Sequence, residues 1–369
     1  MKIFIFHASA GHGHQKAAEV LAKAFLKRGL KPEDVRVIDA LDLAPFVFRK
    51  SYPAIYFHSV KNIPHVWGWF YEMFDLPVTA WLKPFRHFFN FLHGQKLLQL
   101  VKKEKPDVII CAHFFTAELF SSAKAKGKIQ AKIITLITDF LPHSFWVNPG
   151  TDIYWVMGED ASRALQKRGI PKEKIRTGGI PVEDAFKPAG RKAEILSKFK
   201  FETGRLTLLL TSGSFGLGPH AEILKELESF KDKVQCFMVC GKNAGLQQSL
   251  EKISFSYPIR IFGFVDFMPD LMEASDLIVA KTGGLTTCES LAKGIPLIVL
   301  EPIPGQETRN AEILKERNAA FFMEKPEQIK VIVQSILKDP ALIDAKKKEI
   351  QKLSKPHAAE DLASFVLQS

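Results

Sequence analysis

Two histidines follow the first apolar run of the chain, in the segment Ser9-Ala10-Gly11-His12-Gly13-His14. Glycines in such a turn let backbone N–H groups approach a phosphate at a helix N-terminus, where the helix dipole favours negative charge. The segment is not a dinucleotide fingerprint, because Lys16 stands where a third glycine would, and no Gly-Lys-Ser/Thr follows as in a P-loop. An imidazole at the carboxyl end of a strand can accept a proton near neutral pH, so we predict that His14 is a general base. A capping or surface histidine is the alternative.

A second polar cluster consists of Thr138-Asp139, followed closely by His143 and Trp146. Thr138 and Asp139 end another apolar run, which again places polar side chains at the carboxyl edge of a sheet. Asp139 could orient a base, and the ring of Trp146 could pack against a sugar or a lipid chain. A carboxylate at this position also suits a helix or turn cap, and the local sequence supports both interpretations equally.

The third cluster has the most specific pattern, Thr282-Gly-Gly-Leu-Thr286 with Glu289 one helical turn later. A strand that feeds a Gly-Gly turn and a helix predicts a second anion-binding helix start, here without a lysine. Glu289 can accept hydrogen bonds from both ribose hydroxyls of a nucleotide. The next strand ends in a loop with Gln306 and Glu307, whose amide and carboxylate suit the hydroxyls of a hexose. In this order, the three features predict a nucleotide-sugar site.

Aromatic residues concentrate between Phe46 and Phe91, which hold 15 of the 40 aromatics of the chain. No acidic residue occurs from Leu76 to Lys103, although lysines and an arginine do. Aromatic rings with a cationic fringe are typical of an interfacial helix, whose rings lie at head-group level while lysines meet anionic lipids. A large helical insertion packed into the core is the alternative. The membrane candidates are Trp81, Lys83, Phe85 and Arg86.

Short apolar runs alternate with helical patterns along the whole chain, which predicts two α/β domains with parallel sheets. The strands predicted for the first half are 2–7, 35–38, 108–111, 133–137 and 153–156. Those predicted for the second half are 207–210, 235–239, 259–262, 277–280 and 297–300. A helix is predicted over 14–27, and the turn-rich segment 177–181 is the expected hinge. We therefore expect domains at 1–184 and 185–355, and allow for residues 356–369 packing back on the first.

Composition and charge limit the possible partners. The chain has 369 residues, 46% of them hydrophobic, and a net charge of +11. Residues 1–184 carry 26 Lys+Arg against 17 Asp+Glu, a net +9. This charge suits an anionic membrane or a nucleic acid as partner, and simple solubility explains it equally well. No recognised nucleic-acid module is visible, so nucleic acid is not expected. The sequence lacks a membrane-spanning run or a signal sequence, which predicts a cytoplasmic protein in which most of the four cysteines are buried, reduced thiols.

These motifs resemble the monogalactosyldiacylglycerol synthase and processive diacylglycerol β-glucosyltransferase family, which is glycosyltransferase family 28. The family is related to the bacterial N-acetylglucosaminyltransferase that builds the peptidoglycan lipid intermediate. The resemblance covers nearly the whole chain. The segments that carry it, besides 282–286 and 304–307, are Gly11–His14, Thr138–Trp146, Thr177–Val182, Cys240–Asn243 and Gly263–Val265. One departure is His12, where the family often has glycine, so His12 receives no role.

The resemblance implies a GT-B fold, in which two Rossmann-like domains with parallel sheets face a central cleft. It implies that His14 takes the proton from a glycerol hydroxyl and that Asp139 assists at the acceptor side. Residues implied at the acceptor or membrane are His143, Trp146, Trp81, Lys83, Phe85 and Arg86. Residues implied to bind the donor are Gly13, Ser214, Gly263, Phe264, Val265, Gly283, Gly284, Leu285, Thr286, Glu289, Gln306 and Glu307. Of these, 263–265 would meet the uracil, 284–286 the diphosphate, Glu289 the ribose, and Gln306 and Glu307 the sugar.

The implied reaction is an inverting transfer of a hexose from UDP-glucose or UDP-galactose to diacylglycerol, on the inner face of the cell membrane. It would form a β-glycosyldiacylglycerol without a cofactor or a metal ion. Two helix N-termini can supply positive dipole, and no Asp-x-Asp triplet for a metal is present. The alternatives are a transferase acting on a polyprenyl-linked intermediate, a UDP-sugar epimerase, and a UDP-sugar sensor without activity. Glucose and galactose differ in the orientation of one hydroxyl, which the sequence does not distinguish.

Overall fold

The computed structural model describes residues 1–9, 11–213 and 218–368. The predicted donor residue Ser214 lies outside these ranges. The chain divides into two compact units. The first unit comprises residues 1–182, 304–306 and 355–369, and the second comprises residues 183–303 and 307–354.

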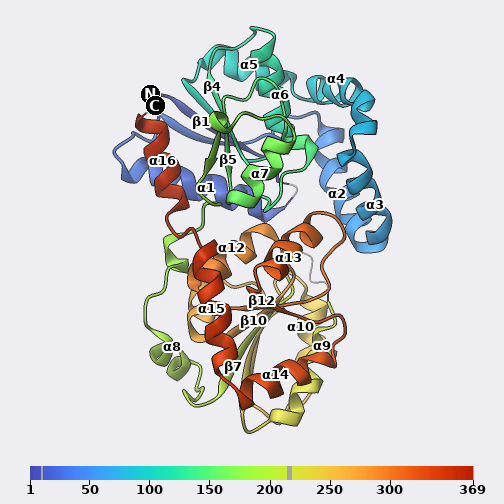
Figure 1. The fold of residues 1–369 in the computed structure, drawn as a ribbon, viewed down its shortest axis with the longest axis vertical. Helices are drawn as coiled ribbons and strands as arrows, with labels where there is room; N and C mark the ends of the chain where they lie inside the picture. Colours follow the sequence, from blue (N-terminus) through green and yellow to red (C-terminus); the bar gives the residue numbers. More distant parts are fainter. Residues whose placement is uncertain (10, 214–217, 369) are drawn as a thin grey trace. The chain divides into compact units, whose positions relative to one another are not determined.

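The first unit is a six-stranded parallel sheet with the order β2-β1-β3-β4-β5-β6 (Figure 1). Its strands are β1 Ile3–His7, β2 Val35–Asp39, β3 Val108–Cys111, β4 Lys132–Leu136, β5 Ile153–Val156 and β6 Ile175–Thr177. Its helices are α1 His12–Lys27, α2 Phe46–Asn62, α3 Pro64–Asp75, α4 Lys83–His93, α5 Gln95–Glu104, α6 Phe114–Ala125, α7 Glu159–Lys167 and α16 Ala358–Gln368. Short 3₁₀ segments are η1 Pro77–Leu82, η2 Ser144–Trp146 and η3 Lys172–Lys174.

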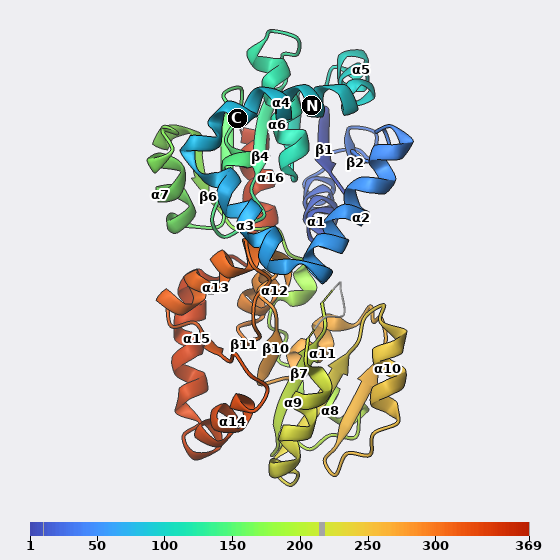
Figure 2. The same cartoon turned by 90° about the vertical axis from the view of Figure 1, so that its right-hand side faces the viewer.

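Alternate residues of a strand point to opposite faces of the sheet, and here both faces carry apolar side chains. Helices therefore cover both faces of this sheet. Phe4 and Phe6 pack with α5 and α6 on one face. Ile3 and Ile5 pack with α1 and α16 on the other face. In Figures 1 and 2 the α2–α4 segment lies on the side of the unit opposite to α16. The first unit therefore presents α2–α4 as a separate helical layer.

The second unit is also a six-stranded parallel sheet, with the order β12-β11-β10-β7-β8-β9. Its strands are β7 Leu206–Thr211, β8 Val234–Val239, β9 Ile259–Phe262, β10 Leu277–Ala280, β11 Leu297–Val299 and β12 Ala320–Phe322. Its helices are α8 Lys192–Lys198, α9 His220–Glu226, α10 Ala244–Glu251, α11 Met268–Ala274, α12 Gly284–Lys293, α13 Gln306–Glu316, α14 Gln328–Lys338 and α15 Ala341–Leu353. The 3₁₀ segments are η4 Asp184–Phe186 and η5 Leu227–Phe230.

The ten predicted strands are all present, each within one residue of its predicted ends. Strand β2 forms an edge of its sheet and leaves Arg36 and Val37 exposed. An edge strand has a neighbour on only one side, so less of its surface is covered. The four cysteines are free and buried, as predicted. None of the described helices combines the length and apolar character needed to cross a bilayer.

Candidate active site

The carboxyl ends of three neighbouring strands bring the chemistry of the first unit together. Strands β1, β3 and β4 are adjacent in the sheet. His7 ends β1, His113 follows β3, and Thr138 and Asp139 follow β4. Helix α1 begins at the same edge, after the extended N-cap residue Gly11. The parallel topology therefore places residues that are more than 100 positions apart in the sequence at one edge.

Hydrogen bonds fix the ring of His14 at this edge. Its Nδ1 lies 2.8 Å from the carbonyl oxygen of Ala112 and 2.9 Å from Oγ1 of Thr138. A carbonyl oxygen can only accept a hydrogen bond, so Nδ1 must carry the proton in the neutral ring. The Nε2 atom then keeps its lone pair. The neighbouring strands thus select the tautomer in which Nε2 can accept a proton.

Burial lowers the pKa of His14 to about 4, against the favourable hydrogen bond to Ala112, and the nearby His7 lowers it further. The half-buried position of His14 removes water that would stabilise the imidazolium. The ring is consequently neutral at pH 7, which is the form that can accept a proton.

Two further histidines belong to this edge and were not singled out from the sequence. The ring of His113 meets that of His14 edge to face, with centroids 4.8 Å apart. Burial lowers the pKa of both His7 and His113. His7 Nδ1 is buried and has no hydrogen-bond partner in the part of the chain that the structure describes. Their position at strand ends could have identified them, because the same position identified Asp139.

Asp139 is buried and accepts a hydrogen bond of 2.8 Å from Nε1 of Trp146. The ring of Trp146 is 1% exposed and belongs to the core of the unit. Our expectation that Trp146 offers a face to a ligand is therefore corrected, because the ring is covered by protein. Asp139 and Trp146 are thus buried together beside the sheet edge that holds His14.

His143 is also buried rather than facing an acceptor or a membrane. Its Nε2 donates to the carbonyl oxygen of Tyr71 at 2.8 Å, and its Nδ1 accepts from the backbone N–H of Phe145 at 3.2 Å. These two bonds require one donor and one acceptor nitrogen, so they also define a neutral tautomer. His143 thus ties α3 to the loop after β4.

In the second unit, the turn between β10 and α12 forms an uncapped helix start. Gly283 is the extended N-cap residue, and it has no side chain to cap the helix. The cap residue itself therefore provides no side-chain acceptor for the first-turn N–H groups. Gly284 is buried, whereas Leu285, Thr286 and Glu289 are half-buried. The first-turn N–H groups and the positive end of the dipole therefore favour an anion at this position.

Glu307 is fixed beside this turn. Its Oε2 accepts from the backbone N–H of Ile303 at 3.0 Å, and its carbonyl oxygen accepts from Oγ1 of Thr282 at 2.7 Å. Burial raises the pKa of the Glu307 carboxyl. Burial also lowers the pKa of Lys281, a half-buried residue that we had not assigned, while Glu307 acts in the opposite direction. The carboxylate of Glu307 and the ammonium group of Lys281 thus lie close to the turn at Gly283 and Gly284.

The predicted uracil-binding residues follow β9 directly. A Cβ atom on Gly263 would lie 2.7 Å from Oε1 of Gln247, so a larger residue would require Gln247 to move. Phe264 is 72% exposed, which is unusual for a ring at a strand end, and Val265 is half-buried. Gln306 is the half-buried first residue of α13. Gly13 is half-buried in the first turn of α1.

Comparisons with known proteins match both units. A family model described as monogalactosyldiacylglycerol (MGDG) synthase matches residues 14–182, and one described as glycosyltransferase family 28 C-terminal domain matches residues 207–364. A processive diacylglycerol beta-glucosyltransferase of Bacillus cereus (strain ZK / E33L) is 27% identical over 384 residues, covering 99% of this chain and 93% of the relative. The enzyme of that description from Bacillus thuringiensis (strain Al Hakam) is 26% identical, covering 100% of this chain and 93% of the relative. The first unit is thus similar to MGDG synthases, and the second unit is similar to the C-terminal domain of family 28 glycosyltransferases.

The family models and the relatives identify the chain as a UDP-sugar-dependent glycosyltransferase, and solved structures establish its fold as GT-B. MurG of Acinetobacter baumannii has a TM-score of 0.61 at 14% identity, covering 100% of this chain and 99% of that one. The UDP-GlcNAc 2-epimerase of Neisseria meningitidis, bound to UDP-GlcNAc, has a TM-score of 0.63 at 15% identity, with full coverage of both chains. Transferases and epimerases thus share this fold, so the family models, rather than the fold, separate the two classes.

The aromatic segment of this glycosyltransferase is mostly exposed. In α2, α3 and α4 the buried residues are only Phe48, Val60, Gly68 and Asn90. Trp81 is 67% exposed and Phe85 is 69% exposed, so a core insertion does not describe these helices. Apolar surface of this extent marks a protein or membrane interface.

The prediction that Arg86 is a surface cation is wrong. Its Nε lies 2.7 Å from Oε2 of Glu118, a carboxylate that is 1% exposed. His87 Nδ1 lies 3.3 Å from the same carboxylate. Burial raises the pKa of Glu118, although Arg86 opposes this effect. Arg86 therefore joins α4 to α6, whereas Lys83 remains exposed.

Proposed function

We propose that the chain transfers a hexose, first of all glucose, from its UDP-sugar to diacylglycerol and forms a β-glycosyldiacylglycerol at a membrane surface. The observation that carries this proposal is the fixed tautomer of His14, whose Nε2 can accept the proton of a hydroxyl nucleophile. The curated relatives support the acceptor and the glucose donor, because they are described as processive diacylglycerol beta-glucosyltransferases.

In the proposed reaction, His14 Nε2 removes the proton from the free glycerol hydroxyl. The hydroxyl oxygen then forms a bond to the anomeric carbon of the sugar, while the bond from that carbon to the diphosphate oxygen breaks. Attack on the face opposite to the leaving group inverts the configuration, so an α-linked donor gives a β-linked product. Thr138 and Ala112 act as positioning residues, because both hold His14 through Nδ1.

The uncapped start of α12 supports the donor half of the proposal. Its N–H groups can stabilise the negative charge that develops on the departing UDP without a metal ion. Glu289 would accept the ribose hydroxyls, and Gln306 and Glu307 would bind the transferred sugar. The reaction should consequently persist after extensive dialysis against EDTA. Loss of turnover there, with recovery on adding Mg²⁺ or Mn²⁺, would contradict metal-free transfer.

The exposed aromatic helices support membrane attachment. Diacylglycerol does not leave a bilayer readily, so its transferase must work at the surface. Exposed rings such as Trp81 and Phe85 can enter the head-group region, and Lys83 can meet anionic lipids. The cytoplasmic face of the cell membrane is the proposed location, since UDP-sugars are cytoplasmic substrates.

The test is incubation of the purified protein with labelled UDP-glucose or UDP-galactose and vesicles that contain either diacylglycerol or a polyprenyl phosphate. We expect a glycolipid from UDP-glucose and diacylglycerol, with one or more sugars per lipid. Products only with the polyprenyl phosphate would support the alternative acceptor. Conversion of UDP-sugar to an epimer without lipid would support an epimerase and overturn the proposal.

A further inference from the structure

Lys281 lies in the second unit, between the end of β10 and the start of α12. Two hydrogen bonds hold the next residue, Thr282. Its Oγ1 donates to the carbonyl oxygen of Glu307 at 2.7 Å, and its carbonyl oxygen accepts from Nδ2 of Asn310 at 2.8 Å. The backbone that carries Lys281 is therefore fixed to α13. No step of the reaction proposed above uses the side chain of Lys281.

Lys281 is half-buried, yet no salt bridge neutralises its ammonium group. Burial lowers the pKa of this group, while the carboxylates of Glu307 and Glu301 raise it. Neither of these carboxylates, nor any other that the structure describes, lies within salt-bridge distance of Lys281. Removing a charge from water without a close partner is unfavourable. A half-buried ammonium group without a salt bridge therefore indicates a site for an anion.

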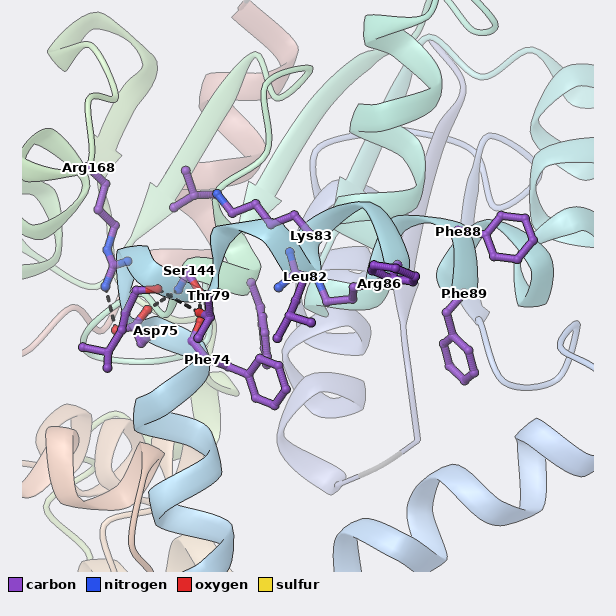
Figure 3. A pocket seen from close by; sticks show the side chains of 14 residues that line it. Phe74, Asp75, Thr79, Leu82, Lys83, Arg86, Phe88, Phe89, Ser144 and Arg168 are labelled. Atoms are coloured by element: carbon purple, nitrogen blue, oxygen red, sulfur yellow. Dashed lines mark hydrogen bonds and ion pairs between the residues drawn. The ribbon is translucent and has the colours of Figure 1, made fainter.

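Other buried and half-buried cations of the chain are paired. Lys293, at the far end of α12, has a side chain that is 3% exposed and lies 2.7 Å from Oε2 of Glu273. In the pocket that Figure 3 shows, Arg168 lies 2.7 Å from Oδ2 of Asp75. Lys281 differs from both in having no such partner among the described residues. We therefore expect its partner to be a ligand.

The start of α12 specifies what kind of anion this is. The helix begins at Gly284 after a glycine cap, and its first turn contains no acidic residue. Its first N–H groups and its dipole, equivalent to about half a positive charge, favour a phosphate. The departing diphosphate gains negative charge during the reaction, and without a metal ion the protein must stabilise that charge. An ammonium group beside the helix start adds a full positive charge.

We propose that Lys281 is a further catalytic residue, whose ammonium group binds the diphosphate of the UDP-sugar and stabilises the charge on the departing UDP. The proposal rests on the proposed function for the position of the donor at α12. The bond from the anomeric carbon to the diphosphate oxygen breaks, and its electron pair stays on that oxygen. Lys281 neither gains nor loses a proton, and it pairs with the oxygen through a charge-assisted hydrogen bond.

The first experiment compares wild-type protein with Lys281→Met. The variant should bind UDP ~10–100-fold more weakly by calorimetry, because a charge-assisted bond is lost. Its affinity for uridine, which has no phosphate, should stay unchanged. Transfer at saturating UDP-glucose should slow by ~10²–10³-fold, as after the loss of an oxyanion-hole donor. Lys281→Arg should recover part of the UDP affinity.

Thermal unfolding separates catalysis from a structural role. Since Lys281→Met removes an unpaired, half-buried charge, its unfolding temperature should equal or exceed that of the wild-type protein. A lower unfolding temperature together with equal losses of UDP and uridine affinity would indicate a structural role and overturn the proposal. Unchanged UDP affinity in the folded variant would overturn it as well.

A second experiment restores the charge chemically. Lys281→Cys treated with 2-bromoethylamine regains an ammonium group, and the native cysteines are buried, so the introduced thiol should react first. This treatment should restore most of the UDP affinity and transfer, whereas iodoacetamide, which leaves a neutral side chain, should restore neither. Lys315→Cys, at an exposed position of α13, should keep wild-type UDP affinity with either reagent. Equal restoration by both reagents would show that charge is not required and overturn the proposal.

The wild-type protein provides a test that needs no variant. UDP should protect Lys281, but not Lys315, from acetylation, and equal acetylation with and without UDP would overturn the proposal. Neither this measurement nor calorimetry requires a lipid. If the wild-type protein forms no glycolipid, the proposed function fails and the binding measurements still judge Lys281. If it forms glycolipid while Lys281→Met binds UDP normally, only the assignment of Lys281 fails.

Discussion

The half-buried position of His14 and its lowered pKa predict a specific loss of stability in acid. In the unfolded chain its imidazole takes up a proton as the pH falls through about 6.5, whereas the folded ring stays neutral until about pH 4. The unfolded state therefore binds the proton first, and the stability contribution present above pH 6.5 is lost as the pH falls toward 4. One pKa unit corresponds to about 1.4 kcal/mol, so about 2 kcal/mol should be lost through His14 between pH 7.5 and pH 5.0.

The assay compares denaturant unfolding of the wild-type protein and His14→Gln at these two pH values. His7 and His113 remain in the variant, so the difference between the two proteins reports His14 together with its effect on these two neighbours. The wild-type protein should lose about 2 kcal/mol more than the variant on acidification. The pKa itself can be read from histidine resonances by NMR. A His14 ring that titrates near 6.5, together with equal acid losses in both proteins, would refute the reasoning.

Three further outcomes are expected. Glu289→Ala should weaken UDP binding by ~1.5–3 kcal/mol, since a charged acceptor for the ribose is lost; unchanged calorimetric affinity in a folded variant would exclude it from the site. Arg86→Met should lower the free energy of unfolding by about 3–5 kcal/mol because the buried Glu118 loses its guanidinium partner and keeps only His87, while Lys83→Met should change it little. Replacing Trp81 and Phe85 with serine should weaken vesicle sedimentation at every salt concentration, and unaltered sedimentation would place the membrane face elsewhere.

The sequence predicted the sheets well because buried parallel strands consist of continuous apolar runs. The two strands that escaped prediction, β6 and β12, are short edge strands that are only partly buried. The equally short β11 is buried throughout and was predicted. The edge position of β2 could not be read from the sequence either, since it depends on the order of strands in the sheet. Local sequence patterns thus predicted where the strands lie, whereas the burial of their side chains depends on the order of the strands in the sheet.

The environment of the site residues was the part that sequence could not supply. The pKa of His14 depends on the burial that surrounding elements impose and on a carbonyl from residue 112, 98 positions away. Arg86 appeared to be a free surface cation because its partner Glu118 is 32 positions away, outside the acid-free segment. Trp146 looked like a ligand platform because sequence does not show which face of a ring is covered.

The measurement that tests the central claim most directly is single-turnover transfer from UDP-glucose to diacylglycerol vesicles by wild-type protein and His14→Gln. With His14 as the base, the wild-type protein forms a β-linked glucosyldiacylglycerol, and the variant forms it ~10²–10⁴-fold more slowly with UDP affinity within a few-fold of normal. Near-normal transfer by His14→Gln, with the chemical step shown to be rate-limiting, would contradict the assignment of the base. An α-linked product, or no lipid product from the wild-type protein, would contradict the proposed reaction itself.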